Sequence, residues 1–223
     1  MYPFFESIRV QDGFARELEA HQQRVNRCLK SHNGLPLDIE ELASQLDLPS
    51  TGLYKWRLQY GLEGNHQSKL SAYVPSHPEQ LRVVCADHIL YPHKYEDRKA
   101  ISQLLQQAQT SAIIMTQKGL ITDSSYANLV FYNGLQWFTP KIPLLAGTQR
   151  ALLLERGTIL EADISLEDLA QFIVFKRINA MMTFESSPNL PVSLICPVYL
   201  NFLIRLAVFV TPRIKGNVLN VGP

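Results

Sequence analysis

The sequence predicts an α+β protein with two domains, a small N-terminal domain that mixes helix and strand and a larger C-terminal domain that is rich in sheet. Three observations support this prediction. Helical and strand-like patterns are mixed over the first 60 residues, strand–turn–strand patterns recur after residue 110, and glycines and prolines interrupt residues 61–78. We therefore expect domains at residues 1–76 and 77–195, followed by an apolar C-terminal extension at residues 196–223.

The N-terminal part is predicted to contain a hairpin, two helices and a further strand. Residues 8–10 alternate apolar and polar side chains ahead of a Gln-Asp-Gly turn, which is typical of a strand that enters a hairpin. Apolar residues recur on one side of a helix over 18–29, and a capping-box pattern begins a second helix over 38–46. Alternation at 56–60 indicates a strand, and the segment 61–78 is expected to connect the domains.

The C-terminal part is predicted to be mostly sheet. Residues 81–85 form a compact apolar strand, and a helix from about residue 96 has the strongest helical periodicity in the chain. Lys118-Gly119 and Asn133-Gly134 are turn dipeptides between apolar runs, so each predicts a hairpin. The remaining predicted elements are a helix over 147–154, a short helix that begins near residue 165, and a strand over 172–175.

The composition excludes several classes of protein. Hydrophobic side chains make up 46% of the 223 residues and charged ones 18%, which supports a buried core and excludes a disordered or collagen-like chain. The 21 Lys and Arg residues against 20 Asp and Glu give a formal charge of +1. This balance argues against nucleic-acid binding, because that function needs a strong basic excess.

The cysteines and the first residues indicate a cytoplasmic protein. Cys28, Cys85 and Cys196 are far apart and form no CxxC motif, so we expect neither a disulfide framework nor a metal site. The first residues lack the basic and apolar segments of a secretory signal.

Residues 190–210 are almost wholly apolar, and their number is close to the roughly 20 residues that cross a bilayer. Pro191 and Pro197 would interrupt a helix early, and Asn201 and Arg205 would lie deep in lipid. A membrane span is therefore not expected, and a buried strand and helix or an irregular extension is the better prediction.

Lys94 is the first candidate for chemistry, since the sequence has no GxGxxG, Walker, HExxH or GxSxG motif. It lies just ahead of the strongest amphipathic helix. A lysine held where a strand meets a helix is partly desolvated, which lowers the pKa of its amine and favours Schiff-base chemistry. The alternative, a solvated surface lysine, is favoured for any lysine taken alone.

A second candidate is the polar run that carries Asp123, Ser124 and Asn128 between two predicted strands. A fixed carboxylate with a hydroxyl and an amide is suited to holding a polar heteroaromatic ring. The alternative is a solvated turn.

The third candidate is a predicted helix start at Gly147, Thr148 and Gln149. Backbone N–H groups without partners and the positive end of the helix dipole favour an anion at such a place. An ordinary capped helix is the alternative.

Several segments resemble one known family in the same order along the chain. They are PFFESIRVQDG with LEAHQQRVNR, then YPHKYEDRKAI, LITDSSYANLVFYNG, WFTPKIPLLAGTQRALLLERG and INAMM. Together they resemble class IV aminotransferases, the fold-type IV pyridoxal-phosphate enzymes that include branched-chain and D-amino acid aminotransferases and 4-amino-4-deoxychorismate lyases. The resemblance covers residues 4–192, is closest to short bacterial members, and implies that the C-terminal domain is a pseudo-barrel.

The resemblance implies a role for each candidate residue. Lys94 would hold pyridoxal 5'-phosphate as a Schiff base and move the proton at the substrate α-carbon. Asp123, where longer members have glutamate, would face the pyridine nitrogen, and Arg24 would bind the phosphate through a two-point contact. The implied cofactor-binding set is Arg24, Lys94, Asp123, Ser124, Asn128, Gly147, Thr148 and Gln149.

The resemblance also implies a homodimer that transaminates an amino acid or eliminates pyruvate from an aminodeoxychorismate-like substrate. Candidate substrate contacts are Phe5 and Arg9, by their position in the resembling motif, and Arg57, which would pair with a substrate carboxylate. Core packing or a surface ion pair is the alternative for each. The competing function is a noncatalytic relative that keeps the fold and acts as a binding or interaction protein.

Overall fold

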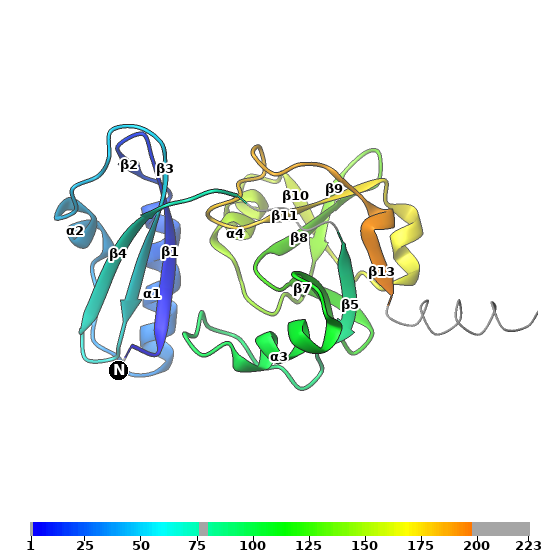
Figure 1. Ribbon diagram of the computed structural model, residues 1–223, viewed down its shortest axis with the longest axis horizontal. Helices are drawn as coiled ribbons and strands as arrows, with labels where there is room; N and C mark the ends of the chain where they lie inside the picture. The colour runs from blue at the N-terminus through cyan, green and yellow to red at the C-terminus, as the bar shows by residue number, and fades with distance from the viewer. Residues whose placement is uncertain (1, 76–79, 198–223) are drawn as a thin grey trace, which may run out of the picture.

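The computed structural model describes residues 2–75 and 80–197 and confirms an α+β fold with a small and a large domain (Figure 1). In the small domain, four strands form an antiparallel sheet in the order β2-β1-β3-β4. Its elements are β1 (Phe4–Gln11), β2 (Phe14–Ala15), α1 (Leu18–Ser31), α2 (Ile39–Ser44), β3 (Leu53–Tyr60) and β4 (His66–Ala72).

The alternation of side chains along β1 and β3 gives the small sheet two different faces. Ile8 and Trp56 pair in register, are completely buried, and belong to the same core cluster as Val25 of α1. Ser7 and Arg57 pair in register on the opposite face, which looks toward the large domain and lines a cavity. The core face and the cavity face are therefore built by neighbouring residues of the same strands.

The prediction that residues 61–78 connect the domains is wrong for residues 66–72, which form a strand of the small sheet. His66 to Ala72 form β4, which pairs with β3 from Tyr60 to Tyr54. The strand was not predicted because it lies at the edge of the sheet, and the side chains from His66 to Lys69 are exposed and polar. Such a strand lacks the apolar alternation that marks half-buried strands.

The large domain contains one sheet path in the order β10-β9-β8-β7-β6-β5-β13, and β11 adds to it by pairing with β8 and β12. The strands are β5 (Leu81–Cys85), β6 (Ile113–Gln117), β7 (Leu120–Ser124), β8 (Asn128–Tyr132), β9 (Trp137–Pro140), β10 (Ile159–Ala162), β11 (Val174–Ile178), β12 (Leu190–Pro191) and β13 (Ile195–Pro197). The helices are α3 (Lys99–Ala108), α4 (Thr148–Glu155) and the 3-10 helices η1 (Glu167–Gln171) and η2 (Val192–Leu194).

Both predicted hairpins of the large domain are confirmed. Lys118 and Gly119 join β6 to β7 with φ angles of 50° and 80°, the left-handed backbone that a tight two-residue hairpin turn requires. Asn133-Gly134 joins β8 to β9. The predicted helix begins at Lys99 instead of residue 96, because the backbone N–H of Glu96 donates to the Pro3 carbonyl in the small domain.

The end of the described chain continues the large sheet. Ile195 to Pro197 pair in parallel with Leu81 to Val83 of β5, so the first two residues of the predicted extension belong to a strand. Residues 76–79, at the predicted domain boundary, and the rest of the extension lie outside the described residues. Within residues 2–75 and 80–197, no helix has the length and apolar character of a membrane span.

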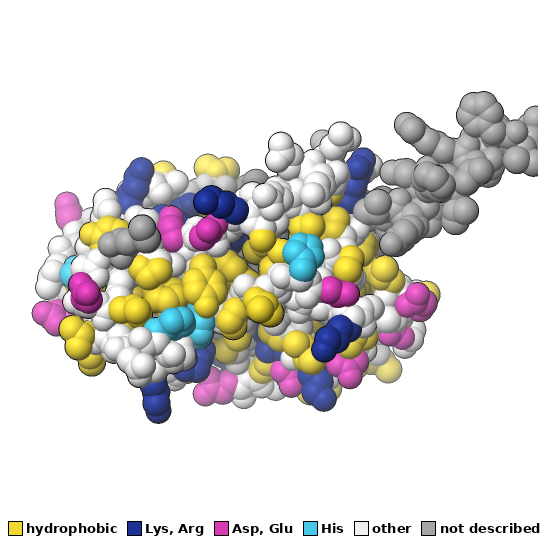
Figure 2. Space-filling view, turned by 90° about the horizontal axis from the view of Figure 1, so that it is seen from below, with side chains coloured by type: hydrophobic (Ala, Val, Ile, Leu, Met, Phe, Trp, Pro, Cys, Tyr) yellow, Lys and Arg dark blue, Asp and Glu magenta, His cyan; other side chains and the backbone are white. Residues whose placement is uncertain are grey.

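Backbone hydrogen bonds join the two domains beside the cavity. The Phe5 N–H donates to the carbonyl of Lys94 (3.0 Å), and the Glu96 N–H donates to the carbonyl of Pro3 (2.8 Å). Phe4 and Tyr95 form a β-bridge between these contacts, and their rings lie 5.4 Å apart. Hydrophobic side chains also gather on the surface where the domains meet (Figure 2). The segment around Lys94 is thus held against the start of β1.

The buried Trp56 predicts where the small domain is most sensitive. Its side chain has no exposed surface, and its Nε1 donates to Ser68 Oγ (3.0 Å). Trp56→Ala should lower the free energy of unfolding by about 3–5 kcal/mol, measured by urea denaturation with far-UV circular dichroism. Phe14→Ala, at a side chain that is 64% exposed, is the control. Equal losses in both variants would contradict this description of the core.

Candidate active site

A cavity of about 430 Å³ lies between the two domains, within the range of roughly 300–1,000 Å³ that is usual for small-molecule sites. β1 and β3 form one wall, the loop before α3 forms another, and β7, β8 and the start of α4 form the third. Nine of the predicted site residues line this larger cavity: Phe5, Arg24, Arg57, Lys94, Asp123, Ser124, Asn128, Gly147 and Thr148.

Arg9 and Gln149 do not line the larger cavity and lie on a smaller one of about 210 Å³. Arg9 is on the same face of β1 as Phe5 and Ser7, but it lies farther along the strand. Its Nη1 donates to the carbonyl of Met181 (3.0 Å), and its Nε donates to Gln11 Oε1 (3.0 Å). The structure therefore places Arg9 beyond the residues that surround Lys94.

Lys94 lies in the loop before α3, against the ring of Phe5. Its Nζ is 4.7 Å from the centroid of that ring. Burial, together with the positive charge of Arg24, lowers the pKa of the Lys94 amine to about 7. A substantial fraction of the amine is therefore neutral near neutral pH, which is the form that acts as a nucleophile.

Asp123, near the end of β7, is buried and held by two protein donors. Asn128 Nδ2 donates to Asp123 Oδ1 (2.7 Å), and the Leu145 N–H donates to Asp123 Oδ2 (2.8 Å). Burial raises the pKa of Asp123 to about 6, although these two hydrogen bonds oppose the rise. The carboxylate is thus fixed in position, and a cationic partner in the cavity would favour its ionised form.

Asn128 and Gly147 fix the geometry around Asp123. Asn128 Nδ2 also donates to the carbonyl of Leu145 (2.8 Å), so one amide joins β8 to the loop before α4. A Cβ atom on Gly147 would lie only 2.0 Å from Asn128 Oδ1. Gly147 is therefore required for this close approach, and it is also the residue that precedes the first turn of α4.

A buried ion pair holds Arg24 at the edge of the larger cavity. Arg24 Nε donates to Glu6 Oε1 (2.8 Å) and Arg24 Nη2 donates to Glu6 Oε2, while His21 Nδ1 lies 2.8 Å from Glu6 Oε2. Burial alone would raise the pKa of Glu6, but the charge of Arg24 and the hydrogen bond of His21 lower it below its ordinary value. The two-point contact fixes the plane of the Arg24 guanidinium.

Sequence reasoning missed Glu6 and His21 as site residues. Two signals were present in the sequence. Glu6 belongs to the PFFES segment that carries part of the family resemblance, and His21 precedes Arg24 by three residues on one face of α1. A carboxylate buried in the core of the small domain needs a cationic partner, here from the helix that packs on the sheet. The strand register must be known before Glu6 can be assigned to the buried face.

Arg57 lies on the wall opposite the large domain, but it already has an acidic partner. Its Nη2 donates to both carboxylate oxygens of Glu96, at 2.7 and 2.6 Å, and its guanidinium lies 3.9 Å from the centroid of the Phe5 ring. Arg57 and Lys94 therefore contact the same aromatic ring. Arg57 thus lines the cavity, and its charge is partly balanced by Glu96.

Gly147→Ala tests the packing around Asp123. The added methyl group would push Asn128 away, so the free energy of unfolding should fall by about 1–3 kcal/mol. The same substitution should cost less in an Asn128→Ala background, because the clashing amide is absent. Urea denaturation of the four variants of this double-mutant cycle measures the difference. An equal cost in both backgrounds would contradict the proposed contact.

The lowered pKa of Lys94 predicts unusual reactivity. Because the amine loses its proton near pH 7, acylation of Lys94 should reach half of its maximal rate at about that pH, whereas free Nα-acetyl-lysine follows its pKa of about 10.4. Competitive labelling with an acylating reagent, read by peptide mass spectrometry between pH 6 and about 11, measures both profiles. A Lys94 profile that follows the free amino acid would show that the side chain is solvated.

Known proteins resemble this chain over most of its length. The family model for amino-transferase class IV matches residues 93–184, the part that carries Lys94, Asp123 and the start of α4. An uncharacterized protein of Haemophilus influenzae is 36% identical over 186 residues, which cover 81% of this chain and 98% of that protein.

Solved structures share the fold. A Haemophilus somnus protein with the provisional name 4-amino-4-deoxychorismate lyase is 33% identical, with a TM-score of 0.77 over 82% of this chain and 98% of that one. The 4-amino-4-deoxychorismate lyase of Pseudomonas aeruginosa is 20% identical, with a TM-score of 0.60 over 93% of this chain and 90% of that one. A hypothetical aminotransferase of Mycobacterium tuberculosis in its PLP-bound form is 16% identical, with a TM-score of 0.68 over 84% and 79%. The chain belongs to the class IV aminotransferase family.

Proposed function

We propose that this protein is a pyridoxal 5'-phosphate enzyme that transaminates an amino acid or eliminates pyruvate from an aminodeoxychorismate-like substrate. One observation carries the proposal. A lysine with an amine pKa of about 7, a buried carboxylate and a fixed arginine line the same cavity, namely Lys94, Asp123 and Arg24. Each supplies a charge or a nucleophile that one part of this cofactor needs.

The residues of the larger cavity fit the cofactor by their chemistry. Arg24 and the first-turn N–H groups of α4 suit the phosphate, with Thr148 adding a hydroxyl, because guanidinium and helix N-termini both favour anions. Asp123 suits the pyridine nitrogen, since a carboxylate there keeps the ring protonated. Ser124, Asn128 and Gly147 complete the wall, and Gln149 lies one residue farther on, at the smaller cavity.

When bound, pyridoxal 5'-phosphate supplies an aldehyde that condenses with an amine and a ring that withdraws electrons from the substrate α-carbon. Lys94 would provide the amine for attachment, and once the amine of the substrate has displaced it, the free Nζ would take and return the α-proton. Its lowered pKa suits both tasks, since a general base works best when its pKa lies near the working pH. Asp123, in its ionised form, would hold a protonated ring nitrogen.

The substrate side of the cavity is formed by Phe5 and Arg57. Phe5 lies against the Lys94 amine, and Arg57, on the same ring, would meet a substrate carboxylate. Arg9 would contact a substrate only where that substrate extends into the smaller cavity. The names of the solved relatives include both lyase and aminotransferase, and the two reactions begin with the same loss of the α-proton. A homodimer in the cytoplasm also stays a prediction.

Reconstitution with the cofactor tests the proposal. Pyridoxal 5'-phosphate should give the visible absorbance band of a protein Schiff base, and borohydride should fix the cofactor to Lys94, as read by peptide mass spectrometry. Lys94→Ala should abolish both signals. Lys99→Ala, an exposed lysine five residues away, should change neither. A wild-type protein without the band, or with the label on another lysine, would favour the noncatalytic alternative.

The reaction is then separated by its products. The reconstituted protein is incubated with a panel of L- and D-amino acids and 2-oxoglutarate, and in parallel with aminodeoxychorismate. Formation of a new amino acid indicates transamination, and release of pyruvate indicates the lyase reaction. If the absorbance band forms but neither product appears, the protein binds the cofactor and has neither of these two activities.

A further inference from the structure

Two histidines from different domains meet where the domains join, and we term them the histidine pair. His32 is the residue that follows α1 in the small domain, and His93 directly precedes Lys94 in the large domain. The centroids of the two rings lie 4.9 Å apart. Both side chains are half-buried, and neither lines the larger cavity. The pair is therefore separate from the residues assigned to the cofactor and the substrate.

Both rings direct a nitrogen at the same atom, the hydroxyl oxygen of Ser31. Ser31 Oγ lies 2.9 Å from His32 Nδ1 and 3.1 Å from His93 Nε2. Ser31 has one hydroxyl hydrogen, which it donates to the carbonyl of Cys28 (2.8 Å). His93 therefore donates to the Ser31 oxygen, and His32 donates to that oxygen or to the Cys28 carbonyl, 2.9 Å from the same Nδ1. Two imidazole nitrogens thus converge on one polar point.

Packing holds the two rings at this separation. The Phe4 side chain is 2% exposed, and its ring centroid lies 5.0 Å from that of His32 and 6.3 Å from that of His93. The hydrogen bond from the Phe5 N–H to the Lys94 carbonyl fixes the neighbouring backbone of both domains. The ring positions are thus set by the same contact that fixes the Lys94 loop, and a ligand would find the two nitrogens already together.

Converging imidazole nitrogens are suited to a divalent transition metal such as Zn²⁺. In a neutral imidazole the proton can lie on either ring nitrogen, so each ring can present a lone pair where it now has an N–H. Zn–N bonds are about 2.1 Å long, so each ring would move inward by about 1 Å. Ser31 is exposed, which gives the metal a path from solvent and leaves room for water to complete its coordination.

This arrangement differs from a structural metal site. Within residues 2–75 and 80–197, no group of three or more His, Cys, Asp or Glu side chains is placed to hold a metal ion. Two imidazoles leave coordination positions open, so binding is weaker and more easily reversed than in a four-ligand site. The sequence did not reveal the pair, because His32 and His93 are far apart in the chain and belong to no metal-binding motif.

We propose that the histidine pair is a binding site for a divalent transition metal, with Zn²⁺ as its ligand, and that the bound ion bridges the two domains. The ion would tie the end of α1 to the loop that carries Lys94, and so stabilise the contact between the domains. The inference goes beyond the proposed function and does not depend on it, because neither histidine lines the larger cavity.

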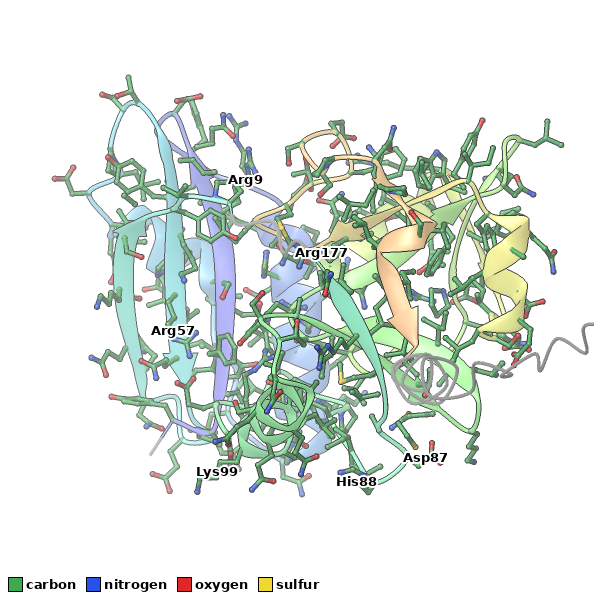
Figure 3. The ribbon with its side chains drawn as sticks, turned by 45° about the vertical axis from the view of Figure 1, so that its right-hand side comes forward. Arg9, Arg57, Asp87, His88, Lys99 and Arg177 are labelled. Carbon is green, nitrogen blue, oxygen red and sulfur yellow. The ribbon has the colours of Figure 1, made fainter. Side chains whose placement is uncertain are left out.

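Calorimetric titration of the full chain with zinc chloride tests the site. The wild type should bind Zn²⁺ saturably, and His32→Ala and His93→Ala should each raise the dissociation constant at least about tenfold, because each removes one of two protein ligands. His88→Ala should leave it unchanged. His88 is the matched control, since it is an exposed histidine outside the pair, at the lower edge of the large domain (Figure 3).

A second measurement uses the wild type alone, so it does not depend on how the variants fold. Diethyl pyrocarbonate modifies accessible imidazoles, and peptide mass spectrometry reads each histidine separately. With Zn²⁺ at ten times its dissociation constant, modification of His32 and His93 should slow about tenfold, because only the metal-free fraction reacts. Modification of His88 should keep its rate.

Three results would overturn the site. They are an unchanged dissociation constant in both His32→Ala and His93→Ala, a loss of Zn²⁺ binding in His88→Ala, and equal modification of the pair with and without Zn²⁺. The second result would place the metal at the exposed loop that carries His88 instead.

Discussion

The backbone contact between β1 and the loop around Lys94 is the constraint on which the site depends. The Phe5 N–H is bound to the Lys94 carbonyl, and the Glu96 N–H is bound to the Pro3 carbonyl, so one short stretch of each domain is fixed to the other. Because these are main-chain bonds, they set the position of Lys94 whatever its side chain does. The aromatic ring of Phe5 then lies against the amine, with Nζ 4.7 Å from the ring centroid.

Buried charges complete the arrangement from both sides. Glu6 brings a negative charge into the core of the small domain, where it is stable only because Arg24 and His21 meet it there. Asp123 is the corresponding charge in the large domain, and its donors are an amide and a backbone N–H instead of a cation. The small domain therefore presents a fixed cation to the cavity, and the large domain presents a fixed carboxylate.

Much of this could be predicted from the sequence. Local patterns identified α1, the two hairpins of the large domain and the helix start at Gly147, because each depends on side chains close in the chain. The resemblance brought Lys94, Asp123 and Arg24 to one site. What could not be predicted depends on register and on contacts between distant segments. The polar edge strand β4, the partner role of Glu6, and the separation of Arg9 from Lys94 all belong to that group.

The two-sided nature of β1 and β3 has a consequence for how such a protein diverges. Lys55 and Arg57 occupy alternate positions of β3 and line the cavity, so substitutions there change the cavity wall. Trp56 and Leu58 point to the other face and form part of the hydrophobic core. The groups suited to the prosthetic group come mainly from other elements, namely α1, β7 and the start of α4. The residues by which β3 lines the cavity can therefore change without altering the hydrophobic core, a separation that allows one scaffold to acquire many specificities.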